Sequence, residues 1–398
     1  MDFGGTSVTG IHVSVIAALR DYFGLEPRPV RVLEMMQMLG FVEEDLKTAM
    51  GIDTEGVYRS TTKFGDRLEN WKPWRMPDGL EILAPGTLAT SIDANGDILI
   101  HPQGDPAAPP SARMPRDGYF FDCIIRQPEI DEGRLDPRDN LEEFTPLPDS
   151  EIDYIAGAAR AARATGRYVI GGFGGLSLGD IANVPAPGLK FPKGIRDITE
   201  WYVSTRSRRG YVHKVFEGQT AAGIRNLERI HAAVGDNLDA VYICGTDFGT
   251  QTSSFCSVAT FNELWAPYYK AICDWVHKNT SWKTFKHSCG AVSKFYPSFI
   301  ECGFDIVNPV QCSAAGMDPG TLKAEFGGQL VFWGGGVDTQ QVLPFGTPEE
   351  VRRQVLERLD IFSRGGGYVF NTVHNIQART PVENVVAMLD AVREFNQG

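Results

Sequence analysis

The sequence contains no long apolar run and no block of charges of one sign. No stretch approaches the roughly 20 consecutive apolar residues that cross a bilayer, so we expect no membrane-spanning segment. The formal net charge is -12, and lysine and arginine form no stripe of the kind that neutralises the phosphates of nucleic acid. We therefore expect neither a membrane nor a nucleic acid as a partner.

The sequence also lacks a disulfide framework. Its seven cysteines are odd in number and scattered, and its first residues have neither the basic nor the apolar segment of a signal peptide. These features predict a cytoplasmic protein whose thiols are free for packing or metal binding. With 42% hydrophobic and 22% charged residues among 398, the composition is that of an ordinary globular protein with room for more than one core.

Residues 1–150 contain short strand-like segments separated by turns. Three of these segments are expected at residues 79–83, 88–92 and 97–101. Asn95-Gly96, between the last two, indicates a β-hairpin. The proline-rich residues 102–115 predict an extended surface loop. We expect this part to be an elaboration of β-hairpins and helices packed on a main barrel portion, residues 151–398, that carries the site.

From residue 151 onward, apolar strand-like segments alternate with helical ones. The expected strands are 168–172, 240–244, 284–287, 305–308, 330–334 and 368–371, with residues 8–13 as a further candidate. The expected helices are 150–165, 218–234, 260–279, 291–302, 318–326, 347–364 and 381–396. Strands without polar alternation indicate a parallel sheet covered by helices. Six or more such units, without a G-x-G-x-x-G turn, favour an α/β protein of the (β/α)8 TIM-barrel type over an open dinucleotide-binding sheet.

In such a barrel, chemistry takes place at the C-terminal ends of the strands, and polar residues collect there in this sequence. His287 and Cys289 follow one strand and, being two residues apart, point the same way. His374, after the last strand, is the natural third ligand, since three nitrogen and sulfur donors with one open position are typical of a catalytic zinc. Cys312 is a weaker candidate, and Cys302 is expected to pack inside a helix. Further polar residues after the strands are Asp247, Asn308, Gln311, Asn371 and Gln377.

Taken together, the segments at these strand ends resemble the uroporphyrinogen decarboxylase superfamily. The segments that carry the resemblance are 245–251, 287–290, 305–318, 332–338 and 374–385. They are most similar to the branch of cobalamin-dependent methyltransferases, in which the His and Cys of such an H-x-C-G motif and a later Cys bind zinc. That later Cys lies six residues before the Thr of a TP-x-EN stretch, where this sequence has His374 instead. The arginine-rich N-terminal motif of the decarboxylases is missing.

The resemblance implies an O-demethylase type of methyltransferase. Zinc held by His287, Cys289 and His374 would act as a Lewis acid on a small methylated substrate, most simply an O-methyl ether. The methyl acceptor would be the Co(I) of a cobalamin (corrinoid) carried by a separate, cognate protein, because no corrinoid-binding D-x-H-x-x-G motif occurs here. Asp247 is the candidate acid/base beside His287. Four residues are candidates for hydrogen bonds to the substrate: Asn308, Gln311, Asn371 and Gln377.

Three alternatives stay open at this point. The same H-x-C pair would serve a methylcorrinoid:thiol methyltransferase, in which zinc holds a thiolate. A porphyrinogen decarboxylase would need a cationic pocket for many carboxylates. A non-catalytic tetrapyrrole-binding protein would bind pigment without zinc or turnover. An exposed apolar rim would suit either the corrinoid partner or a second copy in a homodimer.

Overall fold

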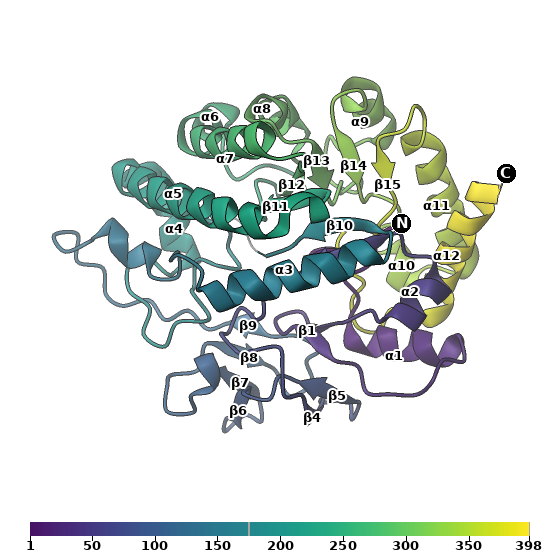
Figure 1. Cartoon of the computed structure of the whole chain (residues 1–398), viewed down its shortest axis with the longest axis horizontal. Coiled ribbons are helices and arrows are strands. Elements are labelled where there is room, and N and C mark those ends of the chain that lie inside the picture. The colour runs from purple at the N-terminus through teal and green to yellow at the C-terminus, as the bar shows by residue number, and fades with distance from the viewer. Residues whose placement is uncertain (174–175, 398) are drawn as a thin grey trace.

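A curved sheet of seven parallel strands forms the centre of the molecule, and helices lie along its outer side (Figure 1). The computed structural model describes residues 1–173 and 176–397. In spatial order the strands are β3 (Thr54–Val57), β10 (Tyr168–Gly171), β11 (Ala240–Cys244), β12 (Lys283–His287), β13 (Ile306–Asn308), β14 (Val331–Trp333) and β15 (Tyr368–Val369). The six strands expected after residue 151 are confirmed as β10 to β15, and the α/β class with a parallel sheet is confirmed with them.

The helices alternate with these strands. They are α3 (Asp149–Ala164), α4 (Ile198–Ser207), α5 (Arg209–Val234), α6 (Val258–Leu264), α7 (Ala266–Asn279), α8 (Tyr296–Cys302), α9 (Pro319–Phe326), α10 (Val342–Phe345), α11 (Pro348–Phe362) and α12 (Val382–Gln397). Helices α4 and α10 were not predicted, and α5 begins earlier than the predicted residue 218. Thr347 starts α11 with a capping box completed by Glu350. The single helix expected at 260–279 is two helices, because Pro267 cannot donate a backbone hydrogen bond and so begins a new one. None of the described helices is both long and apolar enough to cross a membrane.

Side chains alternate between the two sides of each strand, so the two sides of the sheet contribute to different core clusters. The inner side holds a small cluster at the centre of the curved sheet, consisting of Ile170, Ala240, Phe285, Ile306 and Trp333. The outer side packs against the helices in a much larger cluster. On β12, Phe285 and His287 therefore face inward, whereas Lys286 faces the helices.

Residues 1 and 2 lie in the gap between the two edge strands, β3 and β15. The carbonyl of Met1 accepts a hydrogen bond from the Asp53 amide at 2.9 Å, and the amide of Asp2 donates to Phe370 O at 3.0 Å. The buried carboxylate of Asp2 accepts from Thr54 Oγ1 at 2.6 Å and from Trp333 Nε1 at 2.8 Å. This segment thus joins the first and last strands of the sheet through both its backbone and its side chain.

The prediction of a strand at residues 8–13 is wrong. Helix α1 (Val13–Tyr22) begins inside that range, and His12 caps it by accepting from the Ser14 amide at 3.2 Å. Ile11 makes only an isolated parallel bridge to Ile376. The apolar residues of this stretch continue as Val13, Val15 and Ile16 on the buried face of a helix, so their spacing could not by itself exclude a strand.

The rest of the N-terminal part is largely antiparallel. It contains β1 (Val32–Glu34) and β2 (Leu39–Gly40), α2 (Glu44–Met50), the pair β4 (Lys72–Arg75) and β5 (Glu81–Ala84), and a four-stranded sheet of β6 (Ala89–Ile92), β7 (Ile98–His101), β8 (Ala112–Met114) and β9 (Asp122–Cys123). The hairpin across Asn95-Gly96 is confirmed as β6–β7. Residues 102–115 are not simply a loop, because β8 lies within them and buries Ala112 and Met114.

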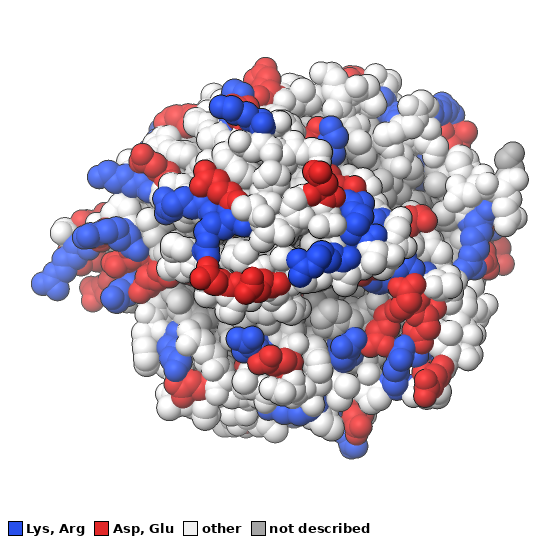
Figure 2. Space-filling view, in the orientation of Figure 1, with Lys and Arg blue, Asp and Glu red and all other residues white. Residues whose placement is uncertain are grey.

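The predicted division of the chain near residue 150 stays a prediction. Strand β3 precedes that position, yet it pairs in parallel with β10 as part of the central sheet. The antiparallel strands lie together below this sheet in Figure 1. Positive and negative side chains are interspersed over the face shown in Figure 2. One ion pair of the structure joins Arg167 and Glu44.

Candidate metal centre

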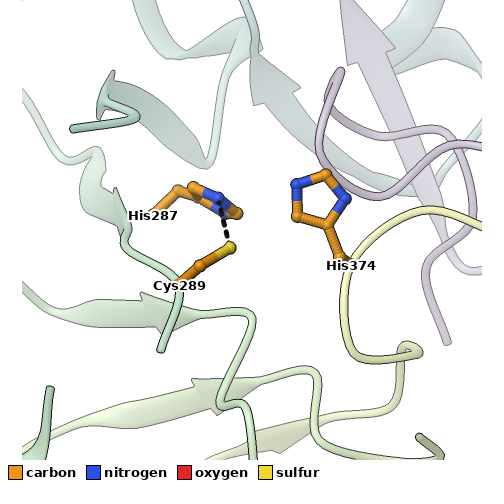
Figure 3. A group of neighbouring side chains, drawn as sticks. All are labelled: His287, Cys289 and His374. Carbon is orange, nitrogen blue, oxygen red and sulfur yellow. Dashed lines mark hydrogen bonds between the residues drawn. The ribbon is translucent and has the colours of Figure 1, made fainter. Parts of the chain in front are cut away.

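Three predicted ligands converge at the C-terminal end of the parallel strands. His287 is the last residue of β12, Cys289 lies two residues further, and His374 lies in the loop between β15 and α12 (Figure 3). One ligand atom from each lies within 4.8 Å of the other two. Within the described part of the chain, this is the one group of three or more His, Cys, Asp or Glu residues arranged to hold a metal ion.

His287 is held in the tautomer that a metal ligand needs. The Asn308 amide donates to Trp333 O at 2.8 Å, which turns its Oδ1 toward His287 Nδ1 at 2.5 Å. Because Oδ1 can only accept, Nδ1 carries the proton and donates it. The lone pair is then on Nε2, which lies 3.4 Å from Cys289 Sγ. Metal-binding histidines commonly donate their second N–H to an oxygen in this way.

Backbone hydrogen bonds hold the turn that carries Cys289. The Cys289 amide donates to Asp247 Oδ1 at 2.6 Å, and the Gly290 amide donates to Gln311 Oε1 at 2.8 Å. Gly290 has a φ of +87°, and a Cβ there would lie 2.4 Å from the backbone of Gly249. Only glycine fits this close approach of the two loops, which brings Asp247 Oδ1 within 3.7 Å of His287 Nε2.

His374 has a left-handed backbone conformation, with a φ of +71°. Such a φ is strained for a non-glycine residue and is often found at functional sites. Its Nδ1 accepts from the Asn375 amide at 2.8 Å, so Nε2 carries the proton of the neutral ring. Ligation through Nε2 would therefore require the proton to move to Nδ1 and this hydrogen bond to break. His374 is less prepared for a metal than His287 is.

Burial controls the charge of these groups. It lowers the pKa of His287 and of His374 to about 3, so both imidazoles are neutral near pH 7 and keep a lone pair. Burial also raises the pKa of Asp247 and raises that of Cys289 well above its ordinary value. A thiolate at Cys289 thus needs a nearby positive charge, which a divalent cation would supply. Two neutral imidazoles and a thiol with this need are a donor set that fits zinc.

The other predicted site residues are divided between this centre and its surroundings. Asn308 and Gln311 are already engaged by His287 and Gly290. Asn371 instead donates to Asp2 O at 2.7 Å, and Gln377 Nε2 lies 3.4 Å from Gln37 Oε1. Substrate binding by these four residues stays a prediction.

The two weaker cysteine candidates lie outside the metal-binding group. Cys302 is buried in α8, where its thiol contacts Ala266 O at 3.6 Å. Cys312 donates to Val310 O at 3.3 Å. Neither is among the three grouped ligands.

A cavity of about 540 Å³ opens at the same end of the sheet. Tyr58 follows β3, Phe173 follows β10, Tyr242 lies in the middle of β11 and Gly245 follows that strand; all four line the cavity. Its charged lining residues are Glu34, Arg59, Lys63, Glu143 and Asp180. The residues that line this cavity were not predicted from the sequence, because β3 was not expected. Asp180 could have been included, since it lies in the segment that follows a predicted strand.

Comparison with known proteins places the chain in a family. A family model described as Uroporphyrinogen decarboxylase (URO-D) matches residues 193–395, just over half of the chain. The uroporphyrinogen decarboxylase of Psychromonas ingrahamii is 35% identical over 89 residues, which cover 21% of this chain and 24% of that protein. That of Coxiella burnetii is 29% identical over 89 residues, with the same coverage. The matches thus span about a quarter of the length of these curated relatives.

A solved structure is similar over nearly the whole length. A methyltransferase from Methanosarcina mazei superposes on 97% of this chain and 99% of its own, at 17% sequence identity and a TM-score of 0.49.

Proposed function

Because the chain belongs to the uroporphyrinogen decarboxylase family, we propose that it is a zinc-dependent methyltransferase of that family. It moves a methyl group from a small O-methylated compound to the Co(I) corrinoid of a partner protein. The observation that carries this proposal is the convergence of His287, Cys289 and His374 at the C-terminal end of the strands. That end is where parallel α/β barrels hold their active sites.

In this proposal, Nε2 of His287, Sγ of Cys289 and a nitrogen of His374 hold the metal. Bound zinc supplies Lewis acidity toward the ether oxygen. The remaining chemistry belongs to the chain. As the C–O bond breaks and the methyl group leaves for the corrinoid, the oxygen needs a proton. Asp247 is placed to donate it, because its carboxyl lies 3.7 Å from His287 Nε2, at the edge of the proposed metal site.

The charge of the cavity supports methyl transfer over porphyrinogen decarboxylation. A porphyrinogen with many carboxylates needs a lining rich in cations. The charged residues that line this cavity are two bases, Arg59 and Lys63, and three acids, Glu34, Glu143 and Asp180. Arg59 also lies 3.6 Å from the carboxylate of Glu151, which offsets its charge. A small substrate with little negative charge suits such a lining better.

The architecture in this proposal is a (β/α)8 barrel. Residues 1–2 take the position of the missing strand between β3 and β15, where their backbone bonds to Asp53 and Phe370 close the sheet. The corrinoid protein would dock over the C-terminal end of the strands, where the ligands and the cavity lie.

The test is metal content, measured by elemental analysis of the purified chain beside two cysteine variants. We expect about one zinc per chain in the wild type, and its loss in Cys289→Ala. Cys256→Ala removes a partly buried cysteine outside the ligand group and should keep the metal. Transfer is then followed as the loss of Co(I) cobalamin absorbance with a panel of methyl ethers. A wild type that binds no zinc when zinc is supplied would contradict the proposal.

A further inference from the structure

Lys286 is a buried lysine immediately behind the metal centre. It is 1% exposed and points from β12 into the helix layer, away from His287. Three aromatic rings surround its ammonium, with Nζ 5.3 Å from the ring centre of Phe248, 5.5 Å from Tyr269 and 5.8 Å from Phe299. Such cation–π contacts only partly replace the water that the ammonium has lost.

No carboxylate among the described residues lies within 4.0 Å of this ammonium. Its hydrogen bonds go to two backbone carbonyls instead, Thr246 O at 2.7 Å and His287 O. Burying a lysine amine without an ionic partner is costly, and a methionine would fill similar space without that cost. The ammonium therefore provides something that packing alone does not. What it provides is a connection between those two carbonyls.

The two carbonyls lie on the two segments that build the centre, the loop after β11 and the end of β12. Thr246 precedes Asp247 in the loop after β11, and His287 is the ligand that ends β12. Further bonds between these loops depend on their spacing: the Phe248 amide donates to Ser288 Oγ at 3.0 Å, and the Cys289 amide donates to Asp247 Oδ1 at 2.6 Å. Lys286 binds both loops from the side opposite to the ligands.

We infer that Lys286 is a positioning residue of the metal centre. Its ammonium ties Thr246 O to His287 O and thereby sets the spacing at which Asp247 meets the Cys289 turn. A lysine suits this role because the donors on its single nitrogen point apart and can reach both carbonyls at once. The effect on zinc binding rests on the proposed function. The hydrogen-bonded connection that Lys286 makes between Thr246 O and His287 O does not.

The experiment compares Lys286→Met with Lys283→Met, which removes a mostly exposed lysine from the start of the same strand. Amide hydrogen exchange is measured on the metal-free proteins. In Lys286→Met the Phe248 and Cys289 amides should exchange about tenfold faster, the effect of weakening roughly one hydrogen bond. Zinc affinity, measured by competition with a chelator, should fall about 10- to 100-fold, as for other residues that orient metal ligands.

Thermal stability separates positioning from a general structural role. Lys286→Met removes the cost of burying the amine but also takes a donor from two carbonyls, so the metal-free Tm should change little while zinc affinity falls. Lys283→Met should match the wild type in all three measurements. Unchanged exchange and zinc affinity in Lys286→Met would overturn the inference. So would faster exchange throughout the sheet accompanied by a lower Tm.

The inference can still be tested if Lys286→Met does not fold or if the wild type binds no zinc. If Lys286→Met does not fold, Lys286→Gln retains N–H donors and should show the same changes in smaller measure; wild-type values in that variant would overturn the inference. If the wild type binds no zinc, the proposed function fails. Amide exchange in the metal-free protein then tests by itself whether Lys286 holds the two segments together.

Discussion

At the scale of residues, Asn308 shows how a side chain outside the ligand set determines what a ligand can do. Its amide nitrogen is committed to Trp333 O, so its oxygen must face His287 Nδ1. The lone pair of His287 is then available on the side of Cys289. Asn308 therefore orients the metal ligand His287. Its position at a strand end also predicts a contact with substrate.

This orientation predicts the effect of Asn308→Ala. Without the acceptor, His287 can adopt either tautomer and rotate, so zinc affinity should fall about 10- to 100-fold. The measurement is chelator competition on the folded variant. Asn279→Ala, on the exposed end of α7, serves as the matched control and should bind zinc as the wild type does. Equal affinity in Asn308→Ala and the control would show that the hydrogen bond to His287 is not needed.

At the scale of elements, a single ion pair joins the first two helices. Arg20, buried in the last turn of α1, makes two parallel hydrogen bonds to Asp45 in the first turn of α2, at 2.9 and 3.0 Å. The Arg20 hydrogen bond lowers the pKa of Asp45 from 3.8 to about 2, although burial opposes the shift. Removing Asp45 would leave the buried guanidinium of Arg20 without its main partner, so this pair holds the end of α1 to the start of α2.

The sign of that pKa shift predicts an acid dependence. Between about pH 4 and pH 2 the unfolded chain binds more protons at Asp45 than the folded chain, so the stabilisation is complete above pH 4 and declines as the pH falls toward 2. Asp45→Asn should lower the free energy of unfolding at pH 6, and the difference from wild type should shrink at pH 3. Urea denaturation at both values measures this.

The control for Asp45 is Asp21→Asn, an exposed change in α1 that should alter stability little at either pH. A difference between wild type and Asp45→Asn that is constant from pH 6 to pH 3 would contradict the linkage.

At the scale of the whole molecule, the two edges of the central sheet meet through Asp2. Its carboxylate binds Thr54 at the start of β3 and Trp333 at the end of β14, while its backbone binds Phe370 beyond β15. Trp333 and Phe370 are each more than 300 residues from Asp2 in sequence, so the curvature of the whole sheet brings them together. The loops that carry the metal ligands follow strands of this same sheet.

Asp2→Ala should therefore weaken the entire fold. The Thr54 hydroxyl and the Trp333 N–H would be buried without an acceptor, which costs about 1–3 kcal/mol for each group. We expect a loss of roughly 2–5 kcal/mol in the free energy of unfolding by urea denaturation. Asp2→Asn keeps one acceptor oxygen and should lose less. Asp117→Ala, at an 88% exposed side chain, should lose almost nothing, and a similar small loss in Asp2→Ala would show that the sheet closes without this contact.

The second half of the fold could be predicted because its periodicity is local. Apolar runs such as 240–244 and capped helices such as the one after Thr347 carry their own signals, and both form as expected. The failures lie where local signals are weak or ambiguous. Strand β3 spans only Thr54–Val57, and the apolar spacing of residues 8–13 fits a helix start as well as a strand. Tertiary pairing decided both.

The α/β class with a parallel sheet and the three candidate ligands could be predicted from the residues alone. Strand alternation places His287 and Cys289 on one side, and the order of strands and helices carries His374 to the same end of the sheet. Only the tertiary structure decided the left-handed turn at His374, the tautomer of His287, the cavity wall at Asp180 and the position of Lys286 behind the loops. The physical reason is that these features arise from contacts between distant segments, which no local periodicity encodes.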